Sequence, residues 1–226
     1  MIVNQNTPRR FKRCKPVLRL SALFAGATAI LAACSAEPNA QDDFMENLAE
    51  LCGNAYSAKV ISTDAVDSIW RASDIVIGPV NCSGGAFKFP LTVGDNRAQS
   101  WVLSAKAGGL SLKHVNKQHA HSDGSVDPIN NYGGQTQNMG TAYRQDFPAD
   151  TFSRKLFEGQ GLPNSAKNIW AMDITPGKAL GYEMSRLPTE AQKAAGEKGR
   201  HFRMEIDITQ PLAASALLSK TPQDED

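Results

Sequence analysis

Apolar and polar side chains alternate along much of the chain after residue 85. Four stretches show this period of two clearly, at residues 86–93, 101–112, 170–184 and 201–208. Each stretch gives one apolar face and one polar face, as an antiparallel sheet with a single core side requires. Weaker stretches of the same kind lie near 55–62, 74–81 and 141–147 and bring the expected number of strands to eight or nine.

Short turn sequences separate these stretches. They are Gly94-Asp95-Asn96-Arg97, Gly108-Gly109 and Pro176-Gly177. Glycine supplies the backbone freedom, and proline the preset φ, that tight turns need. The chain is therefore expected to be mainly β, with consecutive hairpins forming an antiparallel meander that closes as a barrel or packs as a sandwich.

A few segments instead show the helical period. The spacing of Phe44, Leu48 and Leu51 predicts a short amphipathic helix from Asp42 to Gly53. A second helix is predicted over 150–158, with Phe152, Leu156 and Phe157 on one face. Residues 188–200 form a polar insertion before the last strand, and a brief helix is expected at Leu212–Leu218.

The N-terminus has the composition of an export signal. The first nineteen residues carry six basic side chains and no acidic one, and an apolar run follows from Leu20 to Ala33. A run of this length is shorter than the roughly 20 residues that a membrane-spanning helix needs. A basic start, a short apolar middle and small residues at the cut are typical of a cleaved signal peptide.

The end of this segment, Leu31-Ala32-Ala33-Cys34, resembles the lipobox of bacterial lipoproteins. The resemblance implies acylation of Cys34, cleavage before it and attachment to the lipid bilayer by several acyl chains, which anchor firmly where one would be marginal. Ser35, where Asp would indicate inner-membrane retention, resembles the Gram-negative pattern for the outer membrane facing the periplasm. The alternative is an ordinary secretory peptide in which Cys34 is incidental.

Cleavage changes the charge of the chain. Without residues 1–33 the mature protein holds 193 residues with 18 basic and 23 acidic side chains, a formal charge of −5. A mildly acidic protein without clustered Lys and Arg is not expected to bind nucleic acid. We expect residues 34–41 to be a tether, 42–212 a single β-rich domain and 213–226 a C-terminal tail.

Two cysteines remain once the signal is removed and Cys34 is acylated. Cys52 and Cys82 are expected to form a disulfide in an oxidising compartment. Buried free thiols and half of a metal site are the alternatives, although the chain has no CxxC spacing.

Histidines gather in one segment of the chain. His114, His119 and His121 fall within eight residues, and Asp123 follows them. Imidazole and carboxylate groups could hold zinc or another transition metal. A solvated loop with an inward-facing His114 is the alternative, because the spacing matches no specific metal motif and His114 shares parity with Leu110 and Leu112.

Residues 115–140 predict a long loop, rich in Asn, Gly and Gln, of a kind that is usually functional or mobile. It carries Tyr132. Nearby, Asp95 and Arg97 lie on a turn ahead of Trp101, and a guanidinium beside an aromatic ring suits the capture of carboxylate or phosphate. We take these four residues as candidate ligand-binding residues, with an Asp95–Arg97 ion pair as the alternative.

The evidence for catalysis is weak. Glu183, Glu205 and Asp207 could do acid–base chemistry, but their parity places them on the wet face as a charge ladder. The chain has no Gly-x-Ser-x-Gly elbow, no His-Glu-x-x-His and no phosphate-cradling glycine loop. A hydrolase is therefore the least favoured of three hypotheses, after a binding module and a metal-binding protein.

A second resemblance covers about residues 44–210. The segments that carry it are Trp101-Val102-Leu103, Gly109-Leu110-Ser111-Leu112-Lys113-His114, Asp123-Gly124, Tyr132-Gly133-Gly134 and Phe147-Pro148-Ala149-Asp150. Together they resemble a group of exported bacterial proteins of uncharacterised activity. The resemblance implies one intact exported domain and no substrate. The sequence thus favours an envelope lipoprotein that binds a small ligand or another envelope component.

Overall fold

The computed structural model describes residues 39–116, 129–196 and 198–213. Eleven strands dominate them: β1 (Tyr56–Val60), β2 (Ile75–Ile77), β3 (Asn81–Ser83), β4 (Ala86–Val93), β5 (Asn96–Lys106), β6 (Gly109–Asn116), β7 (Tyr132–Gln135), β8 (Arg144–Pro148), β9 (Ile169–Thr175), β10 (Ala179–Arg186) and β11 (Arg200–Asp207). The helices are α1 (Ala40–Ala49), α2 (Ser68–Ala72), α3 (Thr151–Gly159) and α4 (Glu190–Ala194), with single 3-10 turns at Ala65–Asp67 and Ser165–Lys167.

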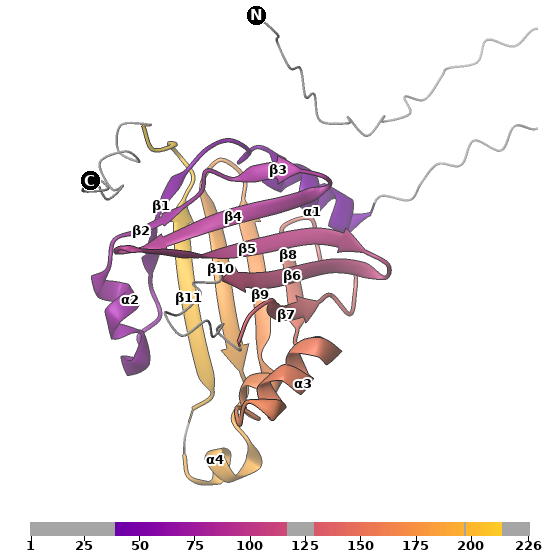
Figure 1. Ribbon diagram of the computed structural model, residues 1–226, viewed down its shortest axis with the longest axis vertical. Helices are drawn as coiled ribbons and strands as arrows, with labels where there is room; N and C mark the ends of the chain where they lie inside the picture. Colours follow the sequence, from indigo (N-terminus) through magenta and orange to yellow (C-terminus); the bar gives the residue numbers. More distant parts are fainter. Residues whose placement is uncertain (1–38, 117–128, 197, 214–226) are drawn as a thin grey trace, which may run out of the picture. The chain divides into compact units, whose positions relative to one another are not determined.

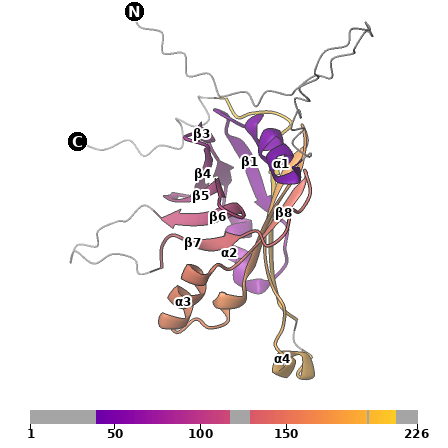
Figure 2. The same ribbon diagram turned by 90° about the vertical axis from the view of Figure 1, so that its right-hand side faces the viewer.

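The strands form one antiparallel sheet that curls into a nearly closed barrel (Figure 1). Its order is β7-β6-β5-β4-β2-β1-β11-β10-β9-β8, so nearly every strand pairs with its neighbour in the sequence. The exceptions are β1, which pairs with β11 as well as β2, and β2, which pairs with β4 because the short strand β3 lies off the main order beside β4. Figure 2 shows β4–β7 on one side of the barrel and β8–β11 on the other. The predicted meander is confirmed, and the barrel is the form it takes.

Two glycines allow the barrel to close between β7 and β8. Gly134 forms an isolated bridge with Ala149, and the Asp150 N–H donates to the Gly133 carbonyl at 3.1 Å. A Cβ on Gly134 would lie 2.2 Å from the Phe147 oxygen, and one on Gly133 would lie 1.9 Å from the Leu112 oxygen. The absence of a side chain thus lets β7 approach β8 at Gly134 and β6 at Gly133.

Strand β7 corrects the sequence prediction of a continuous 115–140 loop. Residues 132–135 pair with β6, with Leu112 opposite Gly134. Two consecutive glycines carry no apolar side chain, so this strand has no alternation from which it could be recognised. Together with β3, it accounts for the difference between eleven strands and the expected eight or nine.

Helix α1 covers one end of the barrel, as both views show (Figures 1 and 2). Asn39 caps it by accepting a hydrogen bond from the Gln41 N–H at 3.0 Å. Phe44 and Leu48 are fully buried in the core, as their spacing predicted. The Gln41 side chain donates to Thr136 Oγ1 and to the Asn138 carbonyl, both at 3.0 Å, which ties the helix to the segment after β7.

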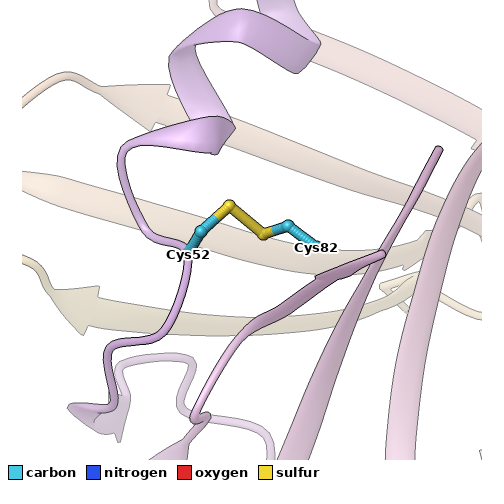
Figure 3. Close-up of a disulfide and its surroundings, with 2 residues drawn as sticks. All are labelled: Cys52 and Cys82. Carbon is cyan, nitrogen blue, oxygen red and sulfur yellow. A yellow bond between two sulfur atoms is a disulfide. The ribbon is translucent and has the colours of Figure 1, made fainter. Parts of the chain in front are cut away.

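The disulfide lies beside the end of α1. Cys52 and Cys82 are bonded, with their Cα atoms 5.7 Å apart (Figure 3). Cys82 belongs to β3 and pairs in register with Phe87 of β4. The predicted bridge is confirmed, and it joins the segment after the N-terminal helix to the edge of the sheet.

Helix α3 begins one residue later than predicted, with Asp150 as its N-cap accepting from the Ser153 N–H at 2.8 Å. Phe157 is buried, but Phe152 is 54% exposed. Phe152 therefore does not share the buried face of Phe157, contrary to the prediction from their spacing; the Lys113 ammonium lies over its ring, 5.2 Å from the ring centre. That ammonium also pairs with the Asp150 carboxylate at 2.5 Å.

Candidate functional site

The inward-facing rows of side chains change character toward one end of the barrel. On β10 the row runs from Leu180 through Tyr182 and Met184 to Arg186, and on β11 it runs from Ile206 through Met204 and Phe202 to Arg200. On β5 and β6, Gln99 and Asn116 follow the buried pair Trp101 and His114. This polar end lies away from α1, toward α2 and α4 (Figure 1).

A hydrogen-bonded pair, His114 and Tyr182, lies where the rows begin to change. His114 is 8% exposed and Tyr182 is 5% exposed, and His114 Nε2 lies 2.6 Å from the Tyr182 hydroxyl. Among the residues that the structure describes, no group is aligned well enough to hydrogen-bond His114 Nδ1. The imidazole is thus held through Nε2 by Tyr182, and the backbone of Tyr132 lies beside its ring.

Aromatic rings surround this pair. The Trp101 ring stacks on Tyr182 with centres 4.1 Å apart, and the Tyr132 ring stacks on His114 at 4.8 Å. Trp170 lies 5.3 Å from His114, and Phe202 lies 6.1 Å from Tyr182. We call these six residues the aromatic cluster. These ring contacts fix the imidazole and the phenol in place within the core.

Both titratable groups of the pair stay neutral near neutral pH. Burial lowers the pKa of His114 to about 4, against the backbone of Tyr132, which favours the protonated ring. Burial also raises the pKa of Tyr182 well above its ordinary value. A neutral imidazole beside a neutral phenol is suited to hydrogen bonding, and its proton affinity is too low for a general base at pH 7.

Beyond the cluster, Arg200 is held by two carboxylates. Its guanidinium donates to both carboxylate oxygens of Asp67, with Nη1 at 2.9 Å, and to Asp64 Oδ2 at 2.8 Å. Asp67 is 2% exposed and also accepts from the Ser62 hydroxyl at 3.3 Å. These bonds fix Arg200 at the start of β11.

A polar crevice of about 300 Å³ adjoins Arg200 at this end. The residues that line it come from the ends of β10 and β11, from α4 and from the segment before α2: Asp64, Arg186, Leu187, Gln192, Lys198, Gly199 and Arg200. Its lining holds three cationic side chains. The crevice is therefore lined mainly by charged and polar side chains, unlike the buried aromatic cluster.

The predicted ligand-binding residues do not all come together. Trp101 and Tyr132 join the aromatic cluster, where Trp101 stacks on Tyr182 and Tyr132 stacks on His114. Asp95 is exposed on the β4–β5 turn, and Arg97 lies just after it with Nε buried. Within the described ranges, Asp95 and Arg97 form no ion pair with each other, and the Arg97 Nε has no hydrogen-bond partner.

The predicted metal site is only partly within the described residues. His119, His121 and Asp123 lie outside them. His114 is inside, and its Nε2 is engaged by Tyr182. Across the described ranges, no three His, Cys, Asp or Glu side chains gather as metal ligands. The metal hypothesis stays a prediction.

The candidate acid–base carboxylates lie on the outer face of the barrel, in an alternating charge network as their parity predicted. The Arg203 guanidinium donates to both Asp173 oxygens at 2.6 and 2.9 Å, and Arg144 bonds Glu183 at 3.3 Å. Gly181 leaves room for this pairing, because a Cβ there would lie 2.6 Å from Asp173 and Arg203 atoms. Glu205 and Asp207 are exposed farther along β11.

Sequence reasoning missed the residues that make the polar end distinctive: Asp67, Tyr182 as a partner of His114, Arg186 and Arg200. A usable signal was present for the arginines. Arg186 continues the inward parity of Tyr182, and Arg200 precedes that of Phe202. Extending each alternation by one step would have placed two arginines side by side at the end of the barrel.

Comparisons of the chain with protein-family models, with curated proteins and with solved structures gave no match. No helix in the described part of the chain has both the length and the apolar character needed to cross a membrane.

Proposed function

We propose that this protein is a lipid-anchored binding module of a bacterial cell envelope, and that it takes its ligand at the polar end of the barrel. Cys34 would carry the acyl chains, and the residues between Cys34 and α1 would tether the domain to the membrane surface; the expected tether of 34–41 is shortened because α1 begins at Ala40. In a Gram-negative cell the domain would stand on the outer membrane and face the periplasm. The ligand would be a small molecule or part of another envelope component.

One observation carries the binding proposal. The inward rows of β5, β6, β10 and β11 all turn from apolar to polar at the same end, while α1 covers the other end. An inward-facing polar residue gains nothing from burial in a finished core, so four such rows ending together indicate contact with something polar. Barrel mouths are a common place for ligand sites of this kind.

Two observations support the envelope location. The lipobox-like Leu31-Ala32-Ala33-Cys34 follows a basic and then apolar segment. The Cys52–Cys82 bond is of a kind that persists in oxidising compartments outside the cytoplasm and is rare inside it.

The location is tested on the native product. The full chain, expressed in a Gram-negative host, is fractionated and its N-terminal peptide is analysed by mass spectrometry. We expect a mature N-terminus at Cys34 bearing acyl chains, in the membrane fraction, and loss of acylation in Cys34→Ser. An unmodified N-terminus in the cytosol would refute the anchoring.

The binding site is tested by hydrogen exchange, with the two ends of the barrel as internal controls. The full chain is incubated with and without the dialysable fraction of a bacterial envelope extract. We expect slower amide exchange at residues 180–186 and 199–204, and no change at 40–52. Exchange unaffected at every peptide, or slowed only around α1, would refute the proposed site.

A further inference from the structure

We propose that the crevice between β10, α4 and the start of β11 is an oxyanion site that takes a phosphate group between Arg186, Lys198 and Arg200. The inference deepens the proposed function and rests on it, because it names the ligand chemistry for the polar end of the barrel. It is carried by the placement of charges around the crevice.

Two arginines face each other across the last pair of residues in the sheet. Arg186 of β10 is in register with Arg200 of β11, so their side chains leave the sheet on the same face. Like charges directly opposite each other destabilise a sheet. Arg200 cannot turn away, because Asp64 and Asp67 hold its guanidinium. The pKa of Arg186 is lowered by burial and by the charge of Arg200.

The carboxylates near the crevice do not neutralise its cations. Asp64 and Asp67 both bond Arg200, and Asp64 also accepts from the His201 N–H at 3.2 Å. Within the described residues, neither Arg186 nor Lys198 has a carboxylate partner. Among these five described groups, both carboxylates are bonded to Arg200, so neither of them offsets the charge of Arg186 or Lys198.

The chain is shaped to bring these groups together. Gly199 lies against β10, where a Cβ would be 2.2 Å from the Arg186 carbonyl oxygen, so Lys198 and Arg200 flank the crevice closely. Gln192 also lines the crevice. Its Oε1 accepts from the Thr189 N–H at 2.9 Å, which leaves its NH₂ group as the part able to donate.

These donors match a phosphate group better than a carboxylate. A guanidinium pairs two N–H groups with two phosphate oxygens, and an ammonium binds as a point charge. Arg200 is largely engaged, because its guanidinium donates to Asp64, Asp67 and the His201 carbonyl. The Arg186 guanidinium, the Lys198 ammonium and the remaining N–H groups of Arg200 still offer more donors than a carboxylate has acceptor atoms. A phosphate supplies three or four oxygens, and its charge offsets the repulsion between Arg186 and Arg200. The group could belong to a free phosphate compound or to a phospholipid headgroup.

The test is calorimetric titration of the full chain in a non-ionic detergent at low salt. The probes are inorganic phosphate and, separately, monomeric dihexanoyl phosphatidylglycerol. We expect saturable binding of at least one probe, with an affinity reduced tenfold or more in Arg186→Gln. The reduction should be smaller in Arg186→Lys, which keeps the positive charge but loses the paired N–H donors of the guanidinium. Binding of the lipid alone would identify a headgroup as the source, and binding of inorganic phosphate would identify a free phosphate compound.

Lys178→Gln is the matched control. It removes one positive charge at the β9–β10 turn, at the opposite end of β10 from Arg186, and should bind as the unaltered chain does. Thermal midpoints of all variants confirm that each is folded. Binding of neither probe, or equal binding by Arg186→Gln and the unaltered chain, would overturn the site. If the envelope extract still slows exchange at the polar end and phosphate does not compete, the proposed function stands and this inference alone fails.

Discussion

The two ends of the barrel are made from the same strands and are filled in opposite ways. At the end covered by α1, the interior ends in Phe44 and Leu48, both without exposure, and the Cys52–Cys82 bond ties the neighbouring segment to the sheet. At the other end, Tyr182 and Phe202 give way to Arg186 and Arg200 on the same inward rows. The first end is completed by the chain itself, and the second ends in polar groups.

The difference is clearest in how arginines are paired. On the outer face, Arg203 bonds both oxygens of Asp173, and Arg144 bonds Glu183. At the polar end, Arg200 takes two carboxylates, and Arg186 opposite it is left with none among the described residues. Matched charges stabilise a surface modestly, whereas a surplus charge held beside a like charge costs stability and needs another reason to be there.

The largest expected effect is at the covered end. Replacing both Cys52 and Cys82 by Ser opens a link between residues 30 positions apart. In the chain-entropy model this lowers the free energy of unfolding by about 3–4 kcal/mol. Urea unfolding measures it. The same loss should follow from reducing the unaltered chain with dithiothreitol, which must leave the double variant unchanged; a double variant as stable as the parent would contradict the role given to the bridge.

The next effect belongs to the aromatic cluster and depends on pH. The pKa of His114 is about 4 in the folded chain against 6.5 for an exposed histidine, so the unfolded state takes up the proton first as pH falls. The contribution of the buried, neutral His114 to the free energy of unfolding is fully present above pH 6.5 and is lost as the pH falls from 6.5 to 4. The loss amounts to about 3 kcal/mol.

Unfolding curves between pH 7 and pH 4 test this contribution. Carboxylates also titrate over the lower part of that range, so the informative quantity is the difference between the unaltered chain and His114→Gln. That variant should have a shallower pH dependence. Parallel curves for the two proteins would show that His114 does not carry the effect.

Removing the partner of His114 should have a smaller effect. Tyr182→Phe keeps the ring that stacks on Trp101 and removes the hydroxyl 2.6 Å from His114 Nε2. A buried nitrogen left without its partner costs about 1–3 kcal/mol. Tyr143→Phe, which removes an exposed hydroxyl, is the control. Equal stability of Tyr182→Phe and the parent would mean that the hydrogen bond contributes nothing.

The smallest expected effect is the difference in stability between a variant of Arg203 on the outer face and a variant of Arg186 at the polar end. Arg203→Gln breaks a matched pair and should lower the free energy of unfolding by about 1 kcal/mol. Arg186→Gln removes a charge opposed by Arg200 and should leave stability unchanged or raise it by a few tenths of a kcal/mol. Thermal unfolding in low salt compares them. If Arg186→Gln were the more destabilised of the two, Arg186 would be a structural residue and the contrast would disappear.

Much of the fold could be predicted because it is local. Alternation identified most strands, turn residues located the hairpins, and the spacing of Phe44 and Leu48 predicted α1. The two short strands were not predicted. Strand β3 consists of three exposed residues, and β7 contains Gly133-Gly134, so neither shows an alternation of apolar and polar side chains. The exposed position of Phe152 was not predicted, because its ring contacts Lys113, which is distant in the sequence.

Less of the site could be predicted. The inward direction of His114 followed from its parity with Leu110 and Leu112. Its partner did not, because Tyr182 lies 68 positions later and meets it only when the sheet curls. The crevice likewise depends on Asp64 and Asp67 reaching Arg200 from more than 130 positions away.

The sequence by itself determined which side chains point inward and which outward, because that choice depends only on the period of a strand. It also determined the signal-like N-terminus and the two cysteines available for pairing. Only the tertiary structure decided that the inward rows end in arginines at one end and in apolar side chains under a helix at the other. That outcome depends on the register of the strands and on the closure of the barrel at Gly133 and Gly134. Both bring together segments that are far apart in the sequence and share no pattern that would predict their contact.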